Sequence, residues 1–191
     1  MFKLVTLEDT IRIPPDKFGN PLSIVGHEQL KMKYEGMIDE ELGYVVAVTK
    51  IQVSPTGKII PGDGATYHKV KFSLLTFLPK IQVVVEGEVV EIADFGAFVR
   101  IGPLDALLHV SQLLDDFISY DEKQGVLLGK ETRRKLGTGD HVRVRITAVS
   151  LGRGGSSGKI GVTARQPFLG KLEWISEDLR RTTGKEEEKG K

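Results

Sequence analysis

The run HVRVRITAV at His141–Val149 is the sequence feature that most constrains what this chain can fold into. Its apolar residues occupy every second position, as they do in a strand with one buried and one exposed face. The exposed face carries Arg143 and Arg145. Because a single strand cannot bury its apolar face alone, the run requires partner strands around a shared core. The predicted inward set is Val142, Val144, Ile146 and Ala148.

Four further strand-like runs in the second half supply those partners. Asp94, the pair Gly102-Pro103 and a glycine-serine segment over 152–158 separate the runs, as turns do. Five short strands with this spacing are typical of an OB barrel, so the second half is predicted to be all-β. The four runs are Val83–Ile92, Phe95–Ile101, Leu104–His109 and Lys159–Ala164.

The first half has a different pattern, which predicts an α+β domain made of a small sheet and one helix. Apolar residues with charged residues between them predict an amphipathic helix over Ser23–Ile38. The turn residues of Ser54–Gly57 lie between two β-branched runs and predict a hairpin. Pro79 ends the last strand. The predicted strands are Met1–Leu7, Gly43–Val53, Lys58–Ile60 and Tyr67–Leu78.

Composition limits the classes of protein to which the chain can belong. Its 191 residues leave room for two small domains, and 40% apolar residues suffice for packed cores. No apolar run reaches the roughly 18–20 residues that span a bilayer, and the N-terminus lacks a signal-peptide pattern, so we expect no membrane association and a cytoplasmic location. The chain has no cysteine and its four histidines are scattered, so we expect no metal and no cofactor.

The nearest approach to a catalytic motif is GVLLGKET at Gly125–Thr132. A phosphate-binding loop places four residues between its two glycines, whereas three stand here, and Glu131 occupies the position of the required hydroxyl. A carboxylate at that position would repel a phosphate. We therefore expect no catalytic residue and no independent enzyme activity.

Charge is distributed unevenly along the second half, although the net charge of the chain is only +1. Between Val83 and Glu122 one basic residue stands against nine acidic ones, whereas Lys123–Arg165 contains ten basic residues and two acidic ones. One interpretation is a positive face that attracts an anionic partner. The other is a set of solvated side chains that balance one another across the barrel.

Three motifs in the second half resemble the S1 family of RNA-binding domains. They are EGEVVEIADFGAFVRI at Glu86–Ile101, LLHVSQL at Leu107–Leu113 and GDHV at Gly139–Val142. The resemblance implies that Phe95, Phe98 and His109 face RNA. Aromatic rings stack on any base, with about 1–3 kcal/mol for each base, while basic side chains hold the phosphates.

The three residues also have structural interpretations. Phe95 and Phe98 are three apart, so they cannot share one face of an ideal strand unless Gly96 forms a bulge; otherwise one of them belongs to the core. His109 is alternatively a structural hydrogen-bonding residue.

Basic RNA contacts are predicted at Arg143, Arg145 and Lys159. Arg143 and Arg145 lie on the outward face of the fourth barrel strand, and the resemblance places a basic residue where Lys159 opens the fifth. Ser150 stands where the S1 family often has an acidic residue, and the glycine-serine segment follows it. The sequence departs from the family pattern at this point.

Motifs over nearly the whole chain resemble the family of the E-prime subunit of archaeal DNA-directed RNA polymerase, the larger stalk subunit and counterpart of the seventh subunit of eukaryotic RNA polymerase II. The additional motifs are MFKLVTLEDTIRIPP, GKIIPGDGATYHKVKFSLLTFLPK and IGVTARQPFLGKLEWI. The resemblance implies an RNP-like tip domain at 1–80 that docks on the polymerase core near the clamp, and an S1 domain at 81–165. It also implies a heterodimer with the polymerase's F subunit and binding of nascent single-stranded RNA during initiation and elongation.

The resemblance further implies roles for individual segments. The core-docking loop would be Pro61, Gly62, Asp63, Gly64 and Ala65, which is alternatively only a tight turn. Val45–Val53 and Val70–Leu78 would serve partly as core and partly as the interface with the F subunit. Residues 166–184 are predicted to pack on the fold, and 185–191 to form a charged, disordered tail. The alternative function is a free-standing S1 protein of translation or RNA decay, which the first half disfavours.

Overall fold

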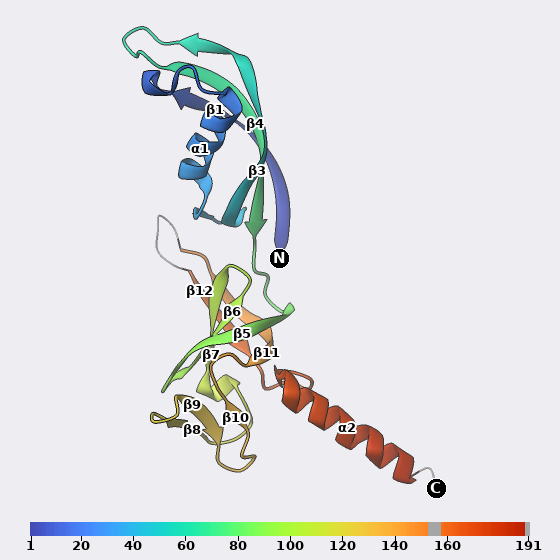
Figure 1. The fold of residues 1–191 in the computed structure, drawn as a ribbon. Coiled ribbons are helices and arrows are strands. Elements are labelled where there is room, and N and C mark those ends of the chain that lie inside the picture. Colours follow the sequence, from blue (N-terminus) through green and yellow to red (C-terminus); the bar gives the residue numbers. More distant parts are fainter. Residues whose placement is uncertain (153–157, 190–191) are drawn as a thin grey trace. The chain divides into compact units, whose positions relative to one another are not determined.

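A computed structural model describes residues 1–152 and 158–189 of the chain (Figure 1). The chain divides into two compact units. The first is Met1–Pro79, and the second is Lys80–Ser150 together with the segment that begins at Gly158.

The first unit is a four-stranded antiparallel sheet with one helix packed on one face (Figure 1). The strand order is β1-β4-β3-β2, and Leu30 of the helix packs in one core with Ile11, Phe72 and Leu74 of the sheet. The predicted small sheet with one helix is confirmed. The elements are β1 (Phe2–Ile13), η1 (Pro15–Lys17), α1 (Leu22–Tyr34), β2 (Ile38–Asp39), β3 (Gly43–Ile59) and β4 (Thr66–Phe77).

Strand β1 continues well beyond the predicted end at Leu7. It pairs with β4 over its whole length, from Phe2 opposite Phe77 to Ile13 opposite Thr66. The polar residues that follow Leu7 conceal this continuation in the sequence, but Glu8 lies opposite Lys71 and forms a cross-strand ion pair with it.

The predicted hairpin at Ser54–Gly57 is wrong, because β3 runs through this segment as one bulged strand. Val53 lies opposite Val70 and Gly57 lies opposite His68, so β3 advances four residues while β4 advances two. The buried His68 ring lies against Gly57, with Nδ1 2.8 Å from the Ser54 carbonyl and Nε2 3.1 Å from the Thr66 hydroxyl. The true β3–β4 turn is the next segment, Ile60–Ala65, which we call the β3–β4 loop.

The second unit contains a closed five-stranded barrel. The order is β12-β7-β6-β5-β11, and pairing of β11 with β12 closes it. Inward side chains such as Val99, Leu108, Val144 and Val162 are fully or almost fully buried, so the predicted OB-type barrel is confirmed. The strands are β5 (Val84–Ala93), β6 (Gly96–Ile101), β7 (Leu104–His109), β11 (His141–Ser150) and β12 (Lys159–Thr163).

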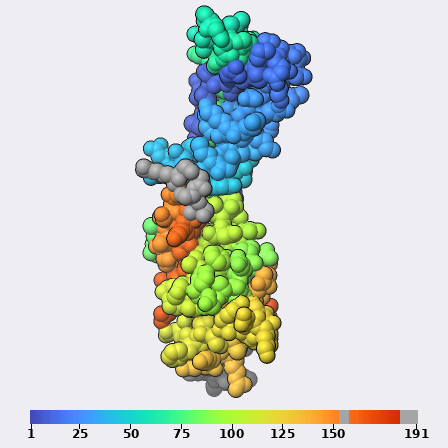
Figure 2. Space-filling model, turned by 90° about the vertical axis from the view of Figure 1, so that its left-hand side faces the viewer, coloured from blue at the N-terminus to red at the C-terminus, as the bar shows by residue number. Residues whose placement is uncertain are grey.

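A small sheet between β7 and β11 was absent from the prediction. It has the order β10-β9-β8 and follows the short turn η2 (Val110–Gln112). Its atoms appear in yellow in Figure 2, gathered in one part of the second unit. Strands of two to four residues rich in charged neighbours show no clear period, which explains the omission. The strands are β8 (Ile118–Asp121), β9 (Val126–Gly129) and β10 (Lys135–Leu136).

The C-terminal segment forms β13 (Gly170–Lys171) and the helix α2 (Leu172–Lys189). Trp174 and Ile175 in the first turn are buried, and Arg134 lies over the Trp174 ring, 5.5 Å from its centroid. The helix includes residues 185–189, which were expected to be disordered; their lysines and glutamates are good helix formers. Residues 190–191 of that predicted tail lie outside the described part. Neither described helix combines the length and apolarity needed to cross a membrane.

One predicted core residue of β11 is exposed. Val142, Val144 and Ile146 are fully buried as expected, but the β11–β12 register shifts between Ile146 and Ala148. This bulge reverses the alternation, so Ala148 points to solvent and Val149 packs against the core instead.

Substitution Gly57→Ala tests the bulge in β3. An added Cβ would lie 2.5 Å from Nε2 of His68, whose buried ring is held at both nitrogens and cannot move freely. We expect a loss of about 1–3 kcal/mol in the free energy of unfolding, measured as faster amide hydrogen exchange of β3 and β4. Gly64→Ala is the control, since its nearest neighbour would be 3.4 Å away. Equal exchange in the two variants would contradict the tight packing at Gly57.

Candidate nucleic-acid interface

The structure places Phe95 and Phe98 in contact with each other. Phe95 precedes β6 in the two-residue turn after Ala93, so strand alternation does not apply to it, and no bulge at Gly96 is needed. The rings pack edge to face with their centroids 6.1 Å apart. Phe95 is 45% exposed and Phe98 is half-buried on the outward face of the barrel. Both rings therefore present surface to a ligand.

His109 lies on the same outward surface, at the end of β7. It pairs with Gly96, while the next outward pair is Phe98 opposite Leu107. Its Nδ1 accepts the Ser111 backbone N–H at 3.2 Å and lies 2.8 Å from the Ser111 hydroxyl. In the neutral ring this acceptor role places the proton on Nε2, where it is available to a phosphate or a base. The structural and ligand-binding interpretations of His109 are thus compatible.

Gly96 allows the aromatic and histidine side chains to meet. A Cβ at this position would lie 2.4 Å from the Leu108 carbonyl oxygen and 3.0 Å from the His109 Cα. Glycine is required here by the close approach of β6 and β7.

Arg143 and Arg145 are not part of this cluster. Arg143 lies opposite Glu86, and its Nε and Nη2 donate to one Glu86 carboxylate oxygen at 2.9 and 2.8 Å. Glu86 is seven residues before Ala93, which borders the Phe95 turn. The Arg143–Glu86 pair is therefore on the order of 20 Å from the Phe95 turn along β5. Arg145 donates to the Gln82 carbonyl at 3.4 Å. Both arginines are half-buried and engaged within the barrel.

Two other basic residues lie closer to the aromatic rings. Lys159 is exposed on β12, two residues before Gly161, which is the partner of Leu107. Arg165 was not predicted as a site residue. Its Nη1 donates to the Ser111 carbonyl at 3.3 Å and its Nη2 to the Asp115 carboxylate. Ser111 thus touches both His109 and Arg165, a proximity that sequence spacing does not show.

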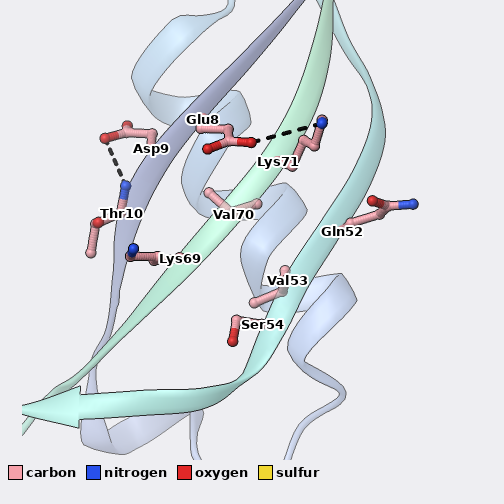
Figure 3. A pocket seen from close by; sticks show the side chains of 9 residues that line it. All are labelled: Glu8, Asp9, Thr10, Gln52, Val53, Ser54, Lys69, Val70 and Lys71. Atoms are coloured by element: carbon pink, nitrogen blue, oxygen red, sulfur yellow. Dashed lines mark hydrogen bonds and ion pairs between the residues drawn. The ribbon is translucent and has the colours of Figure 1, made fainter.

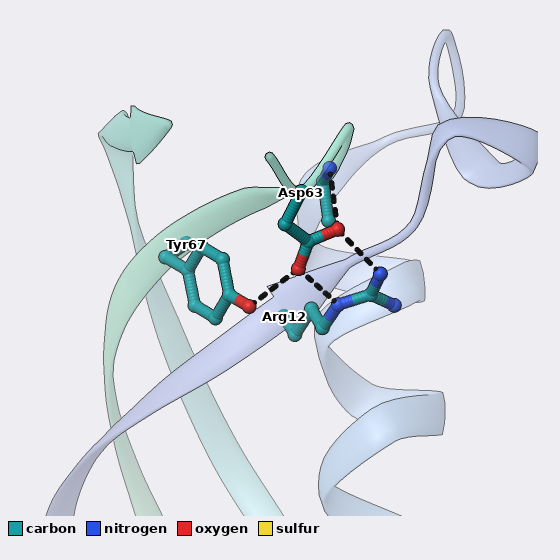
Figure 4. Close-up of polar contacts among 4 residues, drawn as sticks. Arg12, Asp63 and Tyr67 are labelled. Carbon is teal, nitrogen blue, oxygen red and sulfur yellow. Dashed lines mark hydrogen bonds and ion pairs between the residues drawn. The ribbon is translucent and has the colours of Figure 1, made fainter. Parts of the chain in front are cut away.

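The β3–β4 loop of the first unit is held by a polar network centred on Asp63 (Figure 4). Arg12 donates to both Asp63 carboxylate oxygens, at 2.8 and 2.7 Å, and the Tyr67 hydroxyl donates to one of them at 2.6 Å. The Ala65 N–H also donates to Asp63. The Arg12 guanidinium and, next, the Tyr67 hydroxyl hold the pKa of Asp63 well below its ordinary value.

The predicted docking residues of this loop divide into two groups. Ala65 is fully buried and Asp63 faces Arg12, so these two position the loop. Pro61, Gly62 and Gly64 are exposed. Sequence reasoning missed the apolar residues beside them, Ile59 and Ile60, which are 73% and 49% exposed.

A hollow of about 480 Å³ lies on the sheet of the first unit (Figure 3). Its charged groups are largely engaged: Glu8 pairs with Lys71, and Asp9 accepts from Lys33 and Tyr34. In the described ranges, no three acidic or histidine side chains gather closely enough to hold a metal ion. The hollow therefore shows no metal-binding group. Its lining residues are Glu8, Asp9, Thr10, Gln52, Val53, Ser54, Lys69, Val70 and Lys71.

Comparison with known proteins identifies the family. Residues 8–64 match the model of the SHS2 domain found in the N terminus of Rpb7p/Rpc25p/MJ0397, and residues 78–161 match the S1 RNA binding domain. The DNA-directed RNA polymerase subunit Rpo7 of Saccharolobus shibatae is 41% identical over 93% of this chain and 98% of that protein. The chain belongs to the Rpo7 family of DNA-directed RNA polymerase subunits.

Other relatives extend the Rpo7 match. Rpo7 of Sulfolobus acidocaldarius is 37% identical over 96% of this chain and all of that protein. The DNA-directed RNA polymerase III subunit RPC8 of Bos taurus is 28% identical over 79% of this chain and 77% of that protein. Matches over nearly the whole chain do not favour the alternative of a free-standing S1 protein in translation or RNA decay.

The lowered pKa of Asp63 gives a testable titration. A carboxylate whose pKa is lowered by folding stabilises the fold fully above its ordinary pKa of about 3.9, and the contribution is lost as the pH falls toward the lowered value. We expect NMR to show Asp63 still ionised at about pH 3, where an ordinary aspartate is mostly protonated.

The variant Asp63→Asn should weaken this restraint at neutral pH, since the amide has no charge and replaces one of the two acceptor oxygens, each of which now accepts from Arg12, by an NH2 donor. Amide exchange in the β3–β4 loop is expected to accelerate. Asp105→Asn is a matched control, because Asp105 also accepts two bonds from one arginine, Arg100, in the other unit. An ordinary titration of Asp63, or unchanged exchange in Asp63→Asn, would contradict the network.

Proposed function

We propose that this Rpo7-family chain is a non-catalytic stalk subunit of the polymerase, located in the cytoplasm, that binds nascent single-stranded RNA during initiation and elongation. The observation that carries the proposal is the outward cluster of Phe95, Phe98 and His109 on the S1 domain. Aromatic rings stack on any base, and a histidine N–H can donate to a base or a phosphate. This surface therefore suits a single strand of any sequence, such as a growing transcript.

The phosphates of this strand would lie against Lys159 and Arg165, which the β7–β12 pairing and the Ser111 contact place beside the cluster. Lys159 is exposed, whereas Arg165 would share its guanidinium with Asp115. Arg143 would come into contact only with RNA that extends to the far end of β5, and it would have to exchange Glu86 for a phosphate. Arg145 is half-buried and donates to the Gln82 carbonyl. Their contribution to affinity should therefore be the smaller one.

Docking on the polymerase core near the clamp is assigned to the β3–β4 loop. Exposed Ile59 and Ile60 supply apolar anchors, and Pro61, Gly62 and Gly64 allow close approach of a partner backbone. Arg12 and Asp63 keep the loop in one conformation before binding, which lowers the entropy cost of docking.

The polymerase's F subunit is the proposed heterodimer partner of the first unit. In the predicted interface strands Val45–Val53 and Val70–Leu78, the inward side chains of Val45, Phe72 and Leu74 belong to the core and are unavailable. Apolar surface remains on the strands' neighbour β1, where Phe2 is 55% and Leu4 is 70% exposed. We propose that the F subunit covers this surface.

Substitutions test the RNA-binding cluster. Phe98→Ala should weaken single-stranded RNA binding by about 5- to 100-fold, the equivalent of 1–3 kcal/mol of stacking, while the salt dependence stays unchanged. Lys159→Gln should flatten the log–log salt dependence of the affinity by about 0.7. Lys58→Gln, an exposed lysine of the first unit, is the control. Wild-type affinity and slope in both variants would assign Phe98 and Lys159 to structure alone.

Recovery of the tagged chain from its native cell tests the assembly. We expect the F subunit and the large polymerase subunits to copurify, and Ile60→Glu to lose the large subunits while retaining the F subunit, since the charge is placed in the docking loop. Copurification with ribosomes or an RNA-decay complex would refute the stalk assignment. Retention of the large subunits by Ile60→Glu would refute only the docking loop.

A further inference from the structure

The β8–β10 sheet carries an exposed aromatic ring on its solvent-facing side. Ser119, Leu128 and Lys135 form one row across the sheet, and the neighbouring row contains Leu127 and Leu136, which are buried. The Ser119 row therefore faces solvent. The Lys130 N–H donates to the Phe117 carbonyl at 2.9 Å, which continues the pairing and places Phe117 and Lys130 on the same side.

The Phe117 side chain lies mostly outside the packed core. It is 74% exposed, more than any other phenylalanine in the described part of the chain. Leu128, on the same side, is 38% exposed, so the ring and its neighbour form an apolar surface at the end of a small sheet. We call this surface, with the flanking Lys130 and Lys135, the β8–β10 face.

The charge around the β8–β10 face is suited to an anion. Lys130 and Lys135 lie on it, and Lys123 and Arg133 are exposed on the adjoining turns. Asp116 and Asp121 keep their negative charge while they accept backbone N–H donors, Asp116 from Thr132 and Glu131 and Asp121 from the next turn. The other acidic side chains between residues 115 and 136 are Asp115, which pairs with Arg165, Glu122 and Glu131, so this segment has five acidic and five basic residues in total. On the face itself the exposed ring lies beside Lys130 and Lys135. An aromatic ring with flanking lysines matches single-stranded nucleic acid, which offers bases and phosphates together.

A continuous line of contacts joins this face to the proposed RNA cluster. His109 contacts Ser111, Ser111 accepts from Arg165, and Arg165 reaches Asp115, two residues before Phe117. Leu113 is buried in the barrel core and fixes this segment. We infer that the RNA strand continues from His109 past Arg165 to the β8–β10 face, where Phe117 stacks a further base and Lys130 holds a phosphate.

The inference rests on the proposed RNA binding and predicts a dependence on RNA length. The test uses the full chain and oligouridylates of about 4 and about 12 nucleotides, the range of site sizes for OB folds. Phe117→Ala should weaken binding of the long oligonucleotide by about 5- to 100-fold and leave the short one unchanged, since the short strand fills only the Phe95–Phe98 cluster. Phe18→Ala, an exposed phenylalanine of the first unit, is the control.

A second variant, Lys130→Gln, should flatten the salt dependence by about 0.7 for the long oligonucleotide only. If the wild type binds neither length, the proposed RNA binding itself fails. If the wild type binds both and the two variants match it, RNA binding stands and the extension to Phe117 is overturned. Equal losses at both lengths, or loss of polymerase subunits without loss of RNA affinity, would also overturn it, by assigning Phe117 to folding or to a protein partner.

Discussion

The close approach of the β6 and β7 backbones at Gly96 is the constraint on which the proposed RNA-binding surface depends. With no side chain at this position, the Phe95 turn lies against the start of η2, and the Val110 N–H donates to the Phe95 carbonyl at 3.0 Å. Phe95 then meets Phe98 edge to face, and His109 shares their surface. The closed barrel below fixes these side chains, because the alternate residues of β6 and β7 are packed in its core.

In the first unit, polar groups hold the exposed β3–β4 loop in place. Its β3–β4 loop extends beyond the sheet and has little apolar contact to order it, apart from the buried Ala65. Arg12, Asp63 and Tyr67 supply the order instead, through bonds that remain intact throughout the neutral range. Exposed ion pairs are usually weak, but a carboxylate with four donors from three neighbours restrains the backbone that carries it. In both units, then, the exposed side chains to which we assign a function lie on a part of the fold that cannot easily rearrange.

The sequence predicted the architecture better than the site. Alternation in β11 and the S1-like motifs sufficed for the barrel, because buried faces impose a period of two. Ala148 and the Ser54–Gly57 segment were misjudged because bulges break that period, and a bulge depends on the partner strand, as at His68. Phe95, Phe98 and His109 could be named from motifs, but Arg165 could not, since only the fold brings it to Ser111. The outward position of Arg143 predicted that its guanidinium was free to bind RNA. Its pairing with Glu86 of β5 depends on the register of two strands far apart in the sequence, which the sequence alone does not show.

We propose that the emerging transcript passes over the Phe95–Phe98–His109 surface of the assembled polymerase. The most direct measurement is photo-crosslinking in reconstituted elongation complexes, with the photoreactive benzoylphenylalanine in place of Phe98 and the same group in place of Phe18 as the control. We expect a crosslink from position 98 to the emerging transcript and none from position 18. Crosslinks from position 98 to protein alone, or equal crosslinks from both positions, would contradict it.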